Sequence, residues 1–173
     1  MVKMQEKHGR AACDFIPDTY ILPNEYKDFH HHFEMLRQQG DPKKNIWIVK
    51  PANLSRGRGI HLIDDLREVQ VDDLSVISRY ITNPLLINGH KFDLRIYVLV
   101  TSYDPLRIYV FKEGLARFAS VSYSSKIDKD NKFMHLTNYS INKKNDKFVK
   151  NEEAGEDDVG FKWSLSAFCK HLD

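Results

Sequence analysis

The feature that most constrains this chain is a short apolar strand that ends on a lysine and runs directly into a glycine loop. The strand is Trp47–Lys50, and the loop carries Gly57 and Gly59 together with Arg56 and Arg58. Glycine lets a backbone bend close to an anionic group, and the lysine and arginines add positive charge. The pattern predicts a nucleotide-phosphate site; a surface turn with basic residues is the alternative.

The order of strand and loop separates this segment from two common phosphate motifs. A protein kinase places its glycine loop before its lysine strand, and a Walker loop needs Gly-x-x-x-x-Gly-Lys followed by Ser or Thr. Here Lys50 precedes the glycines. Neither motif is therefore present in this segment.

Composition predicts a folded protein of about one domain. The chain has 173 residues, of which 42% are hydrophobic, and its formal net charge is +2. Attraction to an acidic partner must therefore be local. Cys13 and Cys169 match no metal or redox spacing, which favours reduced thiols. The polar first ten residues lack the apolar core of a signal peptide, and the apolar runs are too short for a membrane span, so we expect a cytosolic protein.

Helical periodicity is clear between Pro23 and Gln39. Tyr26, Phe29, Phe33 and Leu36 recur at helical spacing, which predicts an amphipathic helix. The consecutive histidines at 30–32 resemble a metal tract. Neighbouring residues on a helix point about 100° apart, however, so the three rings cannot converge on one ion.

Alternation predicts most of the remaining secondary structure. From Lys91 to Val100, apolar and polar residues alternate after an Asn-Gly turn at 88–89, which predicts one long central strand with Tyr97 and Leu99 buried. Other expected strands are Ile60–Ile63, Ser75–Tyr80, Leu106–Lys112 and an extended piece at Gly114–Ala119.

Charged residues gather at the start of the predicted long strand. Lys91, Asp93 and Arg95 share one face there, where a cleft or a row of cross-strand ion pairs would fit. Arg117 lies among small and apolar neighbours, which suggests partial burial. A partly buried guanidinium needs an anionic partner, either an internal carboxylate or the α-carboxylate of a ligand.

The last third of the chain mixes polar and helical signals. Residues 137–140, Thr-Asn-Tyr-Ser, are dense in groups that bind ribose or phosphate, or that cap a turn. Residues 143–158 are polar and end in acids, which predicts a mobile insertion. A final helix is expected from about Val159, with Phe161, Leu165, Phe168 and Leu172 on one stripe.

Together these segments resemble the tubulin tyrosine ligase-like family, and within it the glutamate-adding polyglutamylases. The resemblance covers about residues 20 to 170. The matching stretches follow the family's order and are Trp47–Pro51 with Ser55–Ile60, Ile77–Ile81, Lys91–Val98 with Thr101–Pro105, Glu113–Ala119 and Phe133–Lys144.

The resemblance implies an α+β, ATP-grasp-like fold: a mixed sheet with flanking helices. It implies an ATP-dependent ligase that adds free L-glutamate through an isopeptide bond to tubulin tails. Lys50 and Arg95 would serve catalysis, and Arg117, Ser140 and Lys162 would bind the incoming glutamate. The residues implied to bind ATP are Lys50, Arg56, Gly57, Ser78, Arg79, Tyr80, Ile81, Lys91, Phe92, Asp93, Thr137 and Asn138.

Magnesium is implied as well, but its expected Asp and Glu-x-Asn ligands have no match before Asp173. We therefore expect an incomplete family domain at 17–173, lacking the C-terminal part of the fold, after a poorly defined segment at 1–16. The alternative is a non-catalytic nucleotide- or tubulin-binding module. RNA binding is disfavoured because residues 56–59 form a single Arg-Gly repeat pair. No membrane partner is expected, and microtubules, including those of the cilium or basal body, are the implied location.

Overall fold

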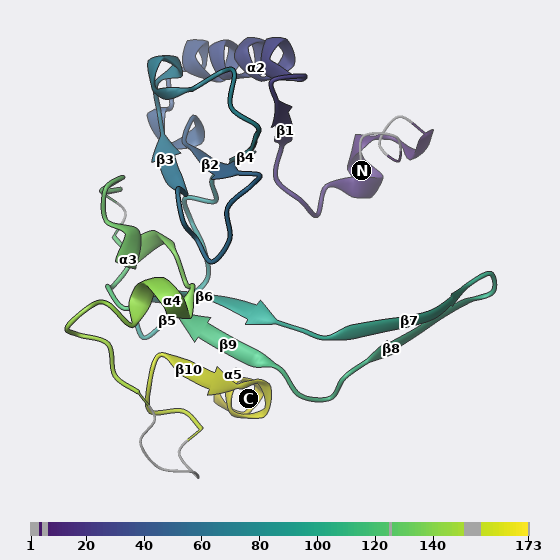
Figure 1. The fold of residues 1–173 in the computed structure, drawn as a ribbon, viewed down its shortest axis with the longest axis vertical. Helices are drawn as coiled ribbons and strands as arrows, with labels where there is room; N and C mark the ends of the chain where they lie inside the picture. Colours follow the sequence, from purple (N-terminus) through teal and green to yellow (C-terminus); the bar gives the residue numbers. More distant parts are fainter. Residues whose placement is uncertain (1–3, 5–6, 125, 151–156, 173) are drawn as a thin grey trace. The chain divides into compact units, whose positions relative to one another are not determined.

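The computed structural model describes residues 4, 7–124, 126–150 and 157–172. The chain divides into two compact units, Met1–Asn83 and Pro84–Asp173 (Figure 1). Both units combine antiparallel strands with helices, which confirms the expected α+β class. Instead of one mixed sheet, the described strands form three antiparallel sheets.

The first unit is a four-stranded sheet packed against one helix. Its elements are the strands β1 (Thr19–Leu22), β2 (Trp47–Pro51), β3 (His61–Ile63) and β4 (Ser75–Arg79), the helix α2 (Tyr26–Gln38), and the 3-10 turns η1 (Arg10–Cys13), η2 (Pro42–Lys44) and η3 (Leu66–Glu68). The strand order is β1-β4-β2-β3. Strands β2 and β4 are thus internal, and the predicted strands at 47–50 and 75–80 are confirmed.

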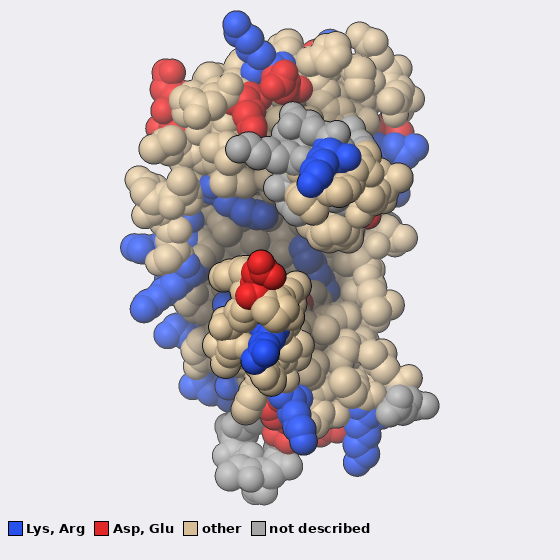
Figure 2. All heavy atoms as spheres, turned by 90° about the vertical axis from the view of Figure 1, so that its right-hand side faces the viewer, with Lys and Arg blue, Asp and Glu red and all other residues tan. Residues whose placement is uncertain are grey.

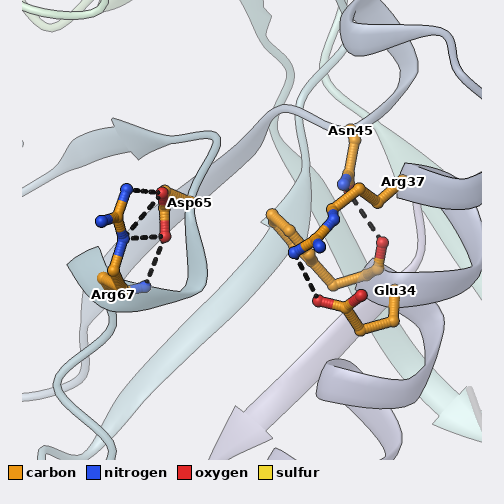
Figure 3. Close-up of polar contacts among 6 residues, drawn as sticks. Glu34, Arg37, Asn45, Asp65 and Arg67 are labelled. Carbon is orange, nitrogen blue, oxygen red and sulfur yellow. Dashed lines mark hydrogen bonds and ion pairs between the residues drawn. The ribbon is translucent and has the colours of Figure 1, made fainter.

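The predicted helix is confirmed as α2, and its apolar stripe forms the core of this unit. Phe29, Phe33 and Leu36 are buried against Trp47 of β2, and the rings of Phe29 and Trp47 meet edge-on with centroids 5.0 Å apart. Asn45 joins helix to strand: its Nδ2 donates to the Phe33 carbonyl at 3.1 Å (Figure 3), and its Oδ1 accepts from the Trp47 indole at 2.9 Å. These two hydrogen bonds hold the start of β2 against α2.

Charged contacts at the surface of the first unit are local. Arg37 donates to Glu34 at 3.1 Å on the exposed side of α2, and Asp65 accepts from the Arg67 side chain at the start of η3 (Figure 3). The hydrogen bond from the Arg67 side chain lowers the pKa of Asp65 to about 2. Because these pairs are solvent-exposed, they stabilise the unit little.

The second unit contains a sheet and a separate two-stranded ribbon. The sheet has the order β10-β9-β6-β5, and the ribbon pairs β7 with β8. The elements are β5 (Leu86–Ile87), β6 (His90–Arg95), β7 (Val98–Tyr103), β8 (Leu106–Val110), β9 (Leu115–Phe118), α3 (Lys132–His135), α4 (Tyr139–Asn142), β10 (Lys162–Ser164) and α5 (Leu165–Leu172).

One face of this sheet is apolar and packs against α5. Phe118 and Trp163 are buried together with ring centroids 4.7 Å apart, and Phe92 packs on Phe168 of the helix at 5.1 Å. Strands β6 and β9 also approach closely where β9 begins. A Cβ at Gly114 would lie 2.5 Å from the Arg95 carbonyl oxygen, so this position requires glycine. The opposite face of the sheet carries the charged side chains.

Two sequence predictions for this unit were wrong in extent. The long strand breaks after Arg95, and its second half leaves the sheet as β7, so Tyr97 and Leu99 are exposed rather than buried. The final helix begins at Leu165 rather than near Val159, because residues 162–164 pair with β9 as a strand. The hairpin at 106–112 and the extended piece at 114–119 are confirmed as β8 and β9.

Parts of two other predictions lie outside the described residues. Residues 151–156 of the expected insertion are not described, and neither are residues 1–3 and 5–6 of the N-terminal segment. In the described part of the chain, every helix is too short or too polar to cross a bilayer.

Candidate nucleotide and amino-acid site

Lys50 lies near the end of β2, on the sheet face opposite the α2 core. Trp47 and Val49 point into the core of the first unit, and side chains alternate along a strand, so Ile48 and Lys50 occupy the other face. Lys50 is exposed, yet partial desolvation lowers the pKa of its ammonium group. The lysine is therefore available to an anion on that face.

The loop after β2 is tightly turned. The Arg58 amide donates to the Ser55 carbonyl at 3.2 Å, and the Ile60 amide donates to the Gly57 carbonyl at 3.4 Å. Arg56, Gly57 and Gly59 all adopt positive φ, at 60°, 79° and 71°. Backbone N–H groups in a tight turn can form a concavity that binds anions, so the loop is suited to a phosphate group.

The end of β4 carries the predicted adenine-reading segment. Ser78 and Tyr80 are buried, and the Tyr80 amide already donates to the Ile46 carbonyl at 2.8 Å. Arg79 is held by Asp18, with Nη1 3.3 Å from the Asp18 carboxylate. Ile81 lies past the end of the strand and is exposed. The Tyr80 amide is therefore already used within the protein, and a ligand at this segment would have to bind backbone groups that follow this amide in the chain.

In the second unit, three charged residues form a row across the sheet. Asp93 of β6 lies opposite Arg117 of β9, and Arg117 lies opposite Lys162 of β10. Residues directly opposite one another in antiparallel strands share a face, so the three side chains project together. Their face is the one opposite Phe118 and Trp163, and it continues along β6 to Arg95.

Arg117 and Asp93 form a two-point ion pair. Arg117 Nε donates to Asp93 Oδ1 at 3.0 Å, and Arg117 Nη2 donates to Asp93 Oδ2. The hydrogen bond from Arg117 to Asp93 raises the pKa of the guanidinium above its ordinary value. Of the two partners left open by the sequence, the internal carboxylate is the one observed. These bonds engage two of the five N–H groups of the arginine, and the rest of the fork can serve a second carboxylate.

Lys91 and Phe92 point to opposite faces of β6. The Lys91 ammonium donates to the His135 carbonyl at 2.9 Å and so links the sheet to the end of α3. Phe92 packs in the apolar core against Phe118 and Phe168. A nucleotide contact from Phe92 would therefore have to come from its backbone.

Residues 137–140 follow α3 and open α4. Thr137, Asn138 and Ser140 are partly buried, and Asn138 is the residue before the first turn of α4. The buried Asn142, which sequence reasoning had not singled out, is hydrogen-bonded to the backbone of this segment. Its run Tyr-Ser-Ile-Asn gave no signal beyond its place in the matched stretch.

The second unit also contains a buried histidine. Burial lowers the pKa of His135, and the nearby Lys91 lowers it further, while a hydrogen bond to the Asp128 carbonyl raises it. The His135 Nε2 lies 2.7 Å from that carbonyl oxygen. The ring is therefore neutral at pH 7.

The candidate residues divide between the two units. Lys50, the glycine loop and residues 78–81 belong to the first unit; Lys91, Asp93, Arg95, Arg117, Thr137, Asn138, Ser140 and Lys162 belong to the second. Within the second unit the structure brings Asp93, Arg117 and Lys162 together. That Lys50 shares a cleft with these residues stays a prediction.

The described part of the chain contains no cluster of side chains suited to binding magnesium. There the structure contains no group of three His, Cys, Asp or Glu side chains that could hold a metal ion, and the Asp93 carboxylate is bound by Arg117. Glu152 and Glu153, acids of the expected insertion, lie outside the described residues.

Comparison with known proteins gives a consistent family. The model of the tubulin-tyrosine ligase family matches residues 1–173. The chain is 46% identical over 173 residues to human tubulin polyglutamylase TTLL5 and 44% identical over 170 residues to human probable tubulin polyglutamylase TTLL2. It is also 44% identical over 174 residues to mouse tubulin monoglutamylase TTLL4. These matches cover 98–99% of this chain but only 13%, 28% and 14% of the three relatives.

Proposed function

Because the chain belongs to the tubulin-tyrosine ligase family, we propose that the complete protein is an ATP-dependent ligase that adds glutamate to glutamate side chains in tubulin tails. The relatives named as tubulin polyglutamylases and a monoglutamylase support the choice of substrate. We place the activity at microtubules, including those of the cilium or basal body.

The observation that carries this proposal is the charged row Asp93–Arg117–Lys162 on one face of the second sheet. Two cations beside one carboxylate leave a net positive strip, which suits an incoming amino acid with two carboxylates. Arg117 would bind the α-carboxylate with the N–H donors that Asp93 does not use, and Asp93 would fix the orientation of the guanidinium. Lys162 would approach the second carboxylate. Ser140 would add a hydroxyl donor.

The remaining residues divide the work of charge stabilisation. ATP, when bound, supplies the phosphoryl group that activates the acceptor carboxylate. Lys50 and the loop at Arg56 and Gly57 would hold phosphate oxygens, and residues 78–81 would contact the base. Arg95, at the exposed end of β6, would stabilise negative charge that develops as the amine attacks. No covalent intermediate with the protein is required.

Charge over the whole surface does not favour an acidic substrate by itself. Figure 2 shows Lys, Arg, Asp and Glu side chains on the visible face of the molecule, and the formal net charge is only +2. Recognition of an acidic tubulin tail would therefore depend on local groups such as the charged row.

The experiment is incorporation of radiolabelled glutamate into microtubules by the complete protein with ATP and magnesium. We expect ATP-dependent label on tubulin that disappears when the acidic tails are removed by limited proteolysis. Lys50→Ala should abolish the label, because the phosphate oxygens lose their lysine. Tail-dependent microtubule binding without incorporation would replace the ligase with a non-catalytic tubulin-binding module.

A further inference from the structure

Asn142 is the most completely buried polar residue of the second unit, with 0% of its side chain exposed. Its Oδ1 accepts two hydrogen bonds from Ser120: one from the backbone amide at 2.8 Å and one from the hydroxyl at 2.7 Å. Ser120 lies two residues beyond the end of β9, the strand that carries Arg117. The acceptor side of Asn142 is therefore fixed to the end of β9.

The donor side of the same amide holds the segment around Thr137. Asn142 Nδ2 donates to the Leu136 carbonyl at 2.6 Å and to the Asn138 carbonyl at 3.1 Å. These two carbonyls flank Thr137 on either side. One side chain thus fixes the backbone before and after Thr137 and ties that backbone to β9.

We propose that Asn142 is a positioning residue for the nucleotide site: it holds Thr137 and Asn138 in register with the strand that carries Arg117. The inference rests on the proposed function and on the ATP contacts that the family resemblance implies for Thr137 and Asn138. Only an amide suits the position, because it supplies two donors and an accepting oxygen in one planar group. Aspartate would lack both N–H donors, and leucine could form none of these hydrogen bonds.

The position also explains why an apolar residue would not serve. Without Asn142, the buried carbonyl of Leu136 and the buried amide of Ser120 would each lose the partner seen here. Leaving buried polar groups without partners costs free energy, and the chain can avoid that cost by shifting the 136–138 backbone toward water. Such a shift would displace Thr137 while leaving the strands paired.

The test compares Asn142→Ala with Asn145→Ala in the complete protein. Asn145 also contacts this network, since its Nδ2 donates to the Ser120 hydroxyl at 2.9 Å, but its side chain is not hydrogen-bonded to residues 136–138. A third variant, Ile87→Ala, removes a side chain of strand β5 from the apolar core, a cluster that does not include residues 136–138. Amide exchange, thermal unfolding and binding of a non-hydrolysable ATP analogue are measured for each, well below the unfolding midpoint.

For Asn142→Ala we expect about tenfold weaker analogue binding, the loss that corresponds to one misplaced hydrogen bond, with a higher KM for ATP and an unchanged KM for glutamate. Exchange should accelerate at Ser120 and residues 136–142 while β6 and β10 stay protected. Asn145→Ala and Ile87→Ala should keep the wild-type affinity, although Ile87→Ala lowers the unfolding midpoint.

Unchanged affinity in folded Asn142→Ala protein would overturn the positioning role and leave the ligase function standing. Equal loss of affinity in Ile87→Ala would show that Asn142 acts only through stability. If Asn142→Ala fails to fold, Ser120→Ala, which keeps the backbone donor and removes the hydroxyl, should show the same effect at smaller size. A wild-type protein that binds no ATP analogue would instead refute the proposed function itself.

Discussion

Strands β6 and β7 are neighbours in one alternating run of sequence, yet they occupy different environments. Strand β6 lies inside the second sheet, with Phe92 in the core and Asp93 paired to Arg117. Strand β7 pairs only with β8 among the described strands, and Val98, Leu99 and Val100 are exposed. Alternation therefore predicts a strand but not its burial, which depends on what packs against each face.

The comparison predicts a large difference in how truncation affects stability. Phe118→Ala should lower the free energy of unfolding by about 3 to 5 kcal/mol, because the ring is buried under α5 with 4% exposure. Ile108→Ala, on the ribbon at 52% exposure, should change it by no more than about 0.5 kcal/mol. Chemical denaturation of both variants checks this, and equal losses would mean that the ribbon is buried in solution.

A smaller effect is expected at the charged face of β6. Asp93→Ala should destabilise the second unit by about 1 kcal/mol, because the pair with Arg117 is hydrogen-bonded at two points but remains partly solvated. Thermal unfolding in low and high salt measures this, and Arg117→Ala should cost a similar amount. A loss of stability that is insensitive to salt would contradict an electrostatic origin.

The buried His135 predicts a pH dependence for the sheet that β7 does not share. Burial lowers the pKa of His135, so the unfolded chain, with a pKa near 6.5, takes up the proton more readily than the folded one. This contribution to stability is complete above pH 6.5 and is lost as the pH falls below it. The unfolding midpoint should be lower at pH 5.5 than at pH 7.5, and His135→Gln should reduce that difference.

The smallest effect is expected from polar substitutions on the ribbon. Val98→Thr and Tyr109→Thr should change the free energy of unfolding by no more than about 0.5 kcal/mol and keep the hairpin paired, since both side chains are largely exposed. Amide exchange of residues 98–110 reports on the pairing. A drop comparable to that of Phe118→Ala would show that another surface covers these residues.

Sequence reasoning succeeded where local patterns decide structure. The helix α2 and the strands β2, β4, β8 and β9 follow from periodicity and turn residues alone. The short strands β1, β5 and β10 were missed because two to four residues show little alternation. Strands β1 and β10 depend on pairing with strands distant in the sequence, and β5 pairs with the adjacent β6 across the 88–89 turn. The break after Arg95 was missed because the alternation continues past it, and no local residue interrupts the pattern.

The candidate site divides in the same way. Lys91, Asp93 and Arg95 were placed on one face of a strand by alternation, and the structure confirms that placement. The alignment of Lys162 with Arg117 and the role of Asn142 depend on pairings across 45 and 22 residues, which no single-sequence pattern specifies.

The central claim is that Arg117 binds the incoming amino acid rather than the nucleotide, and the affinities of Arg117→Ala protein for glutamate and for an ATP analogue test it most directly. We predict that glutamate binding weakens by about 2 to 5 kcal/mol, because a carboxylate loses its charged partner, while affinity for the analogue stays near the wild-type value. An equally steep fall in nucleotide affinity would contradict the account.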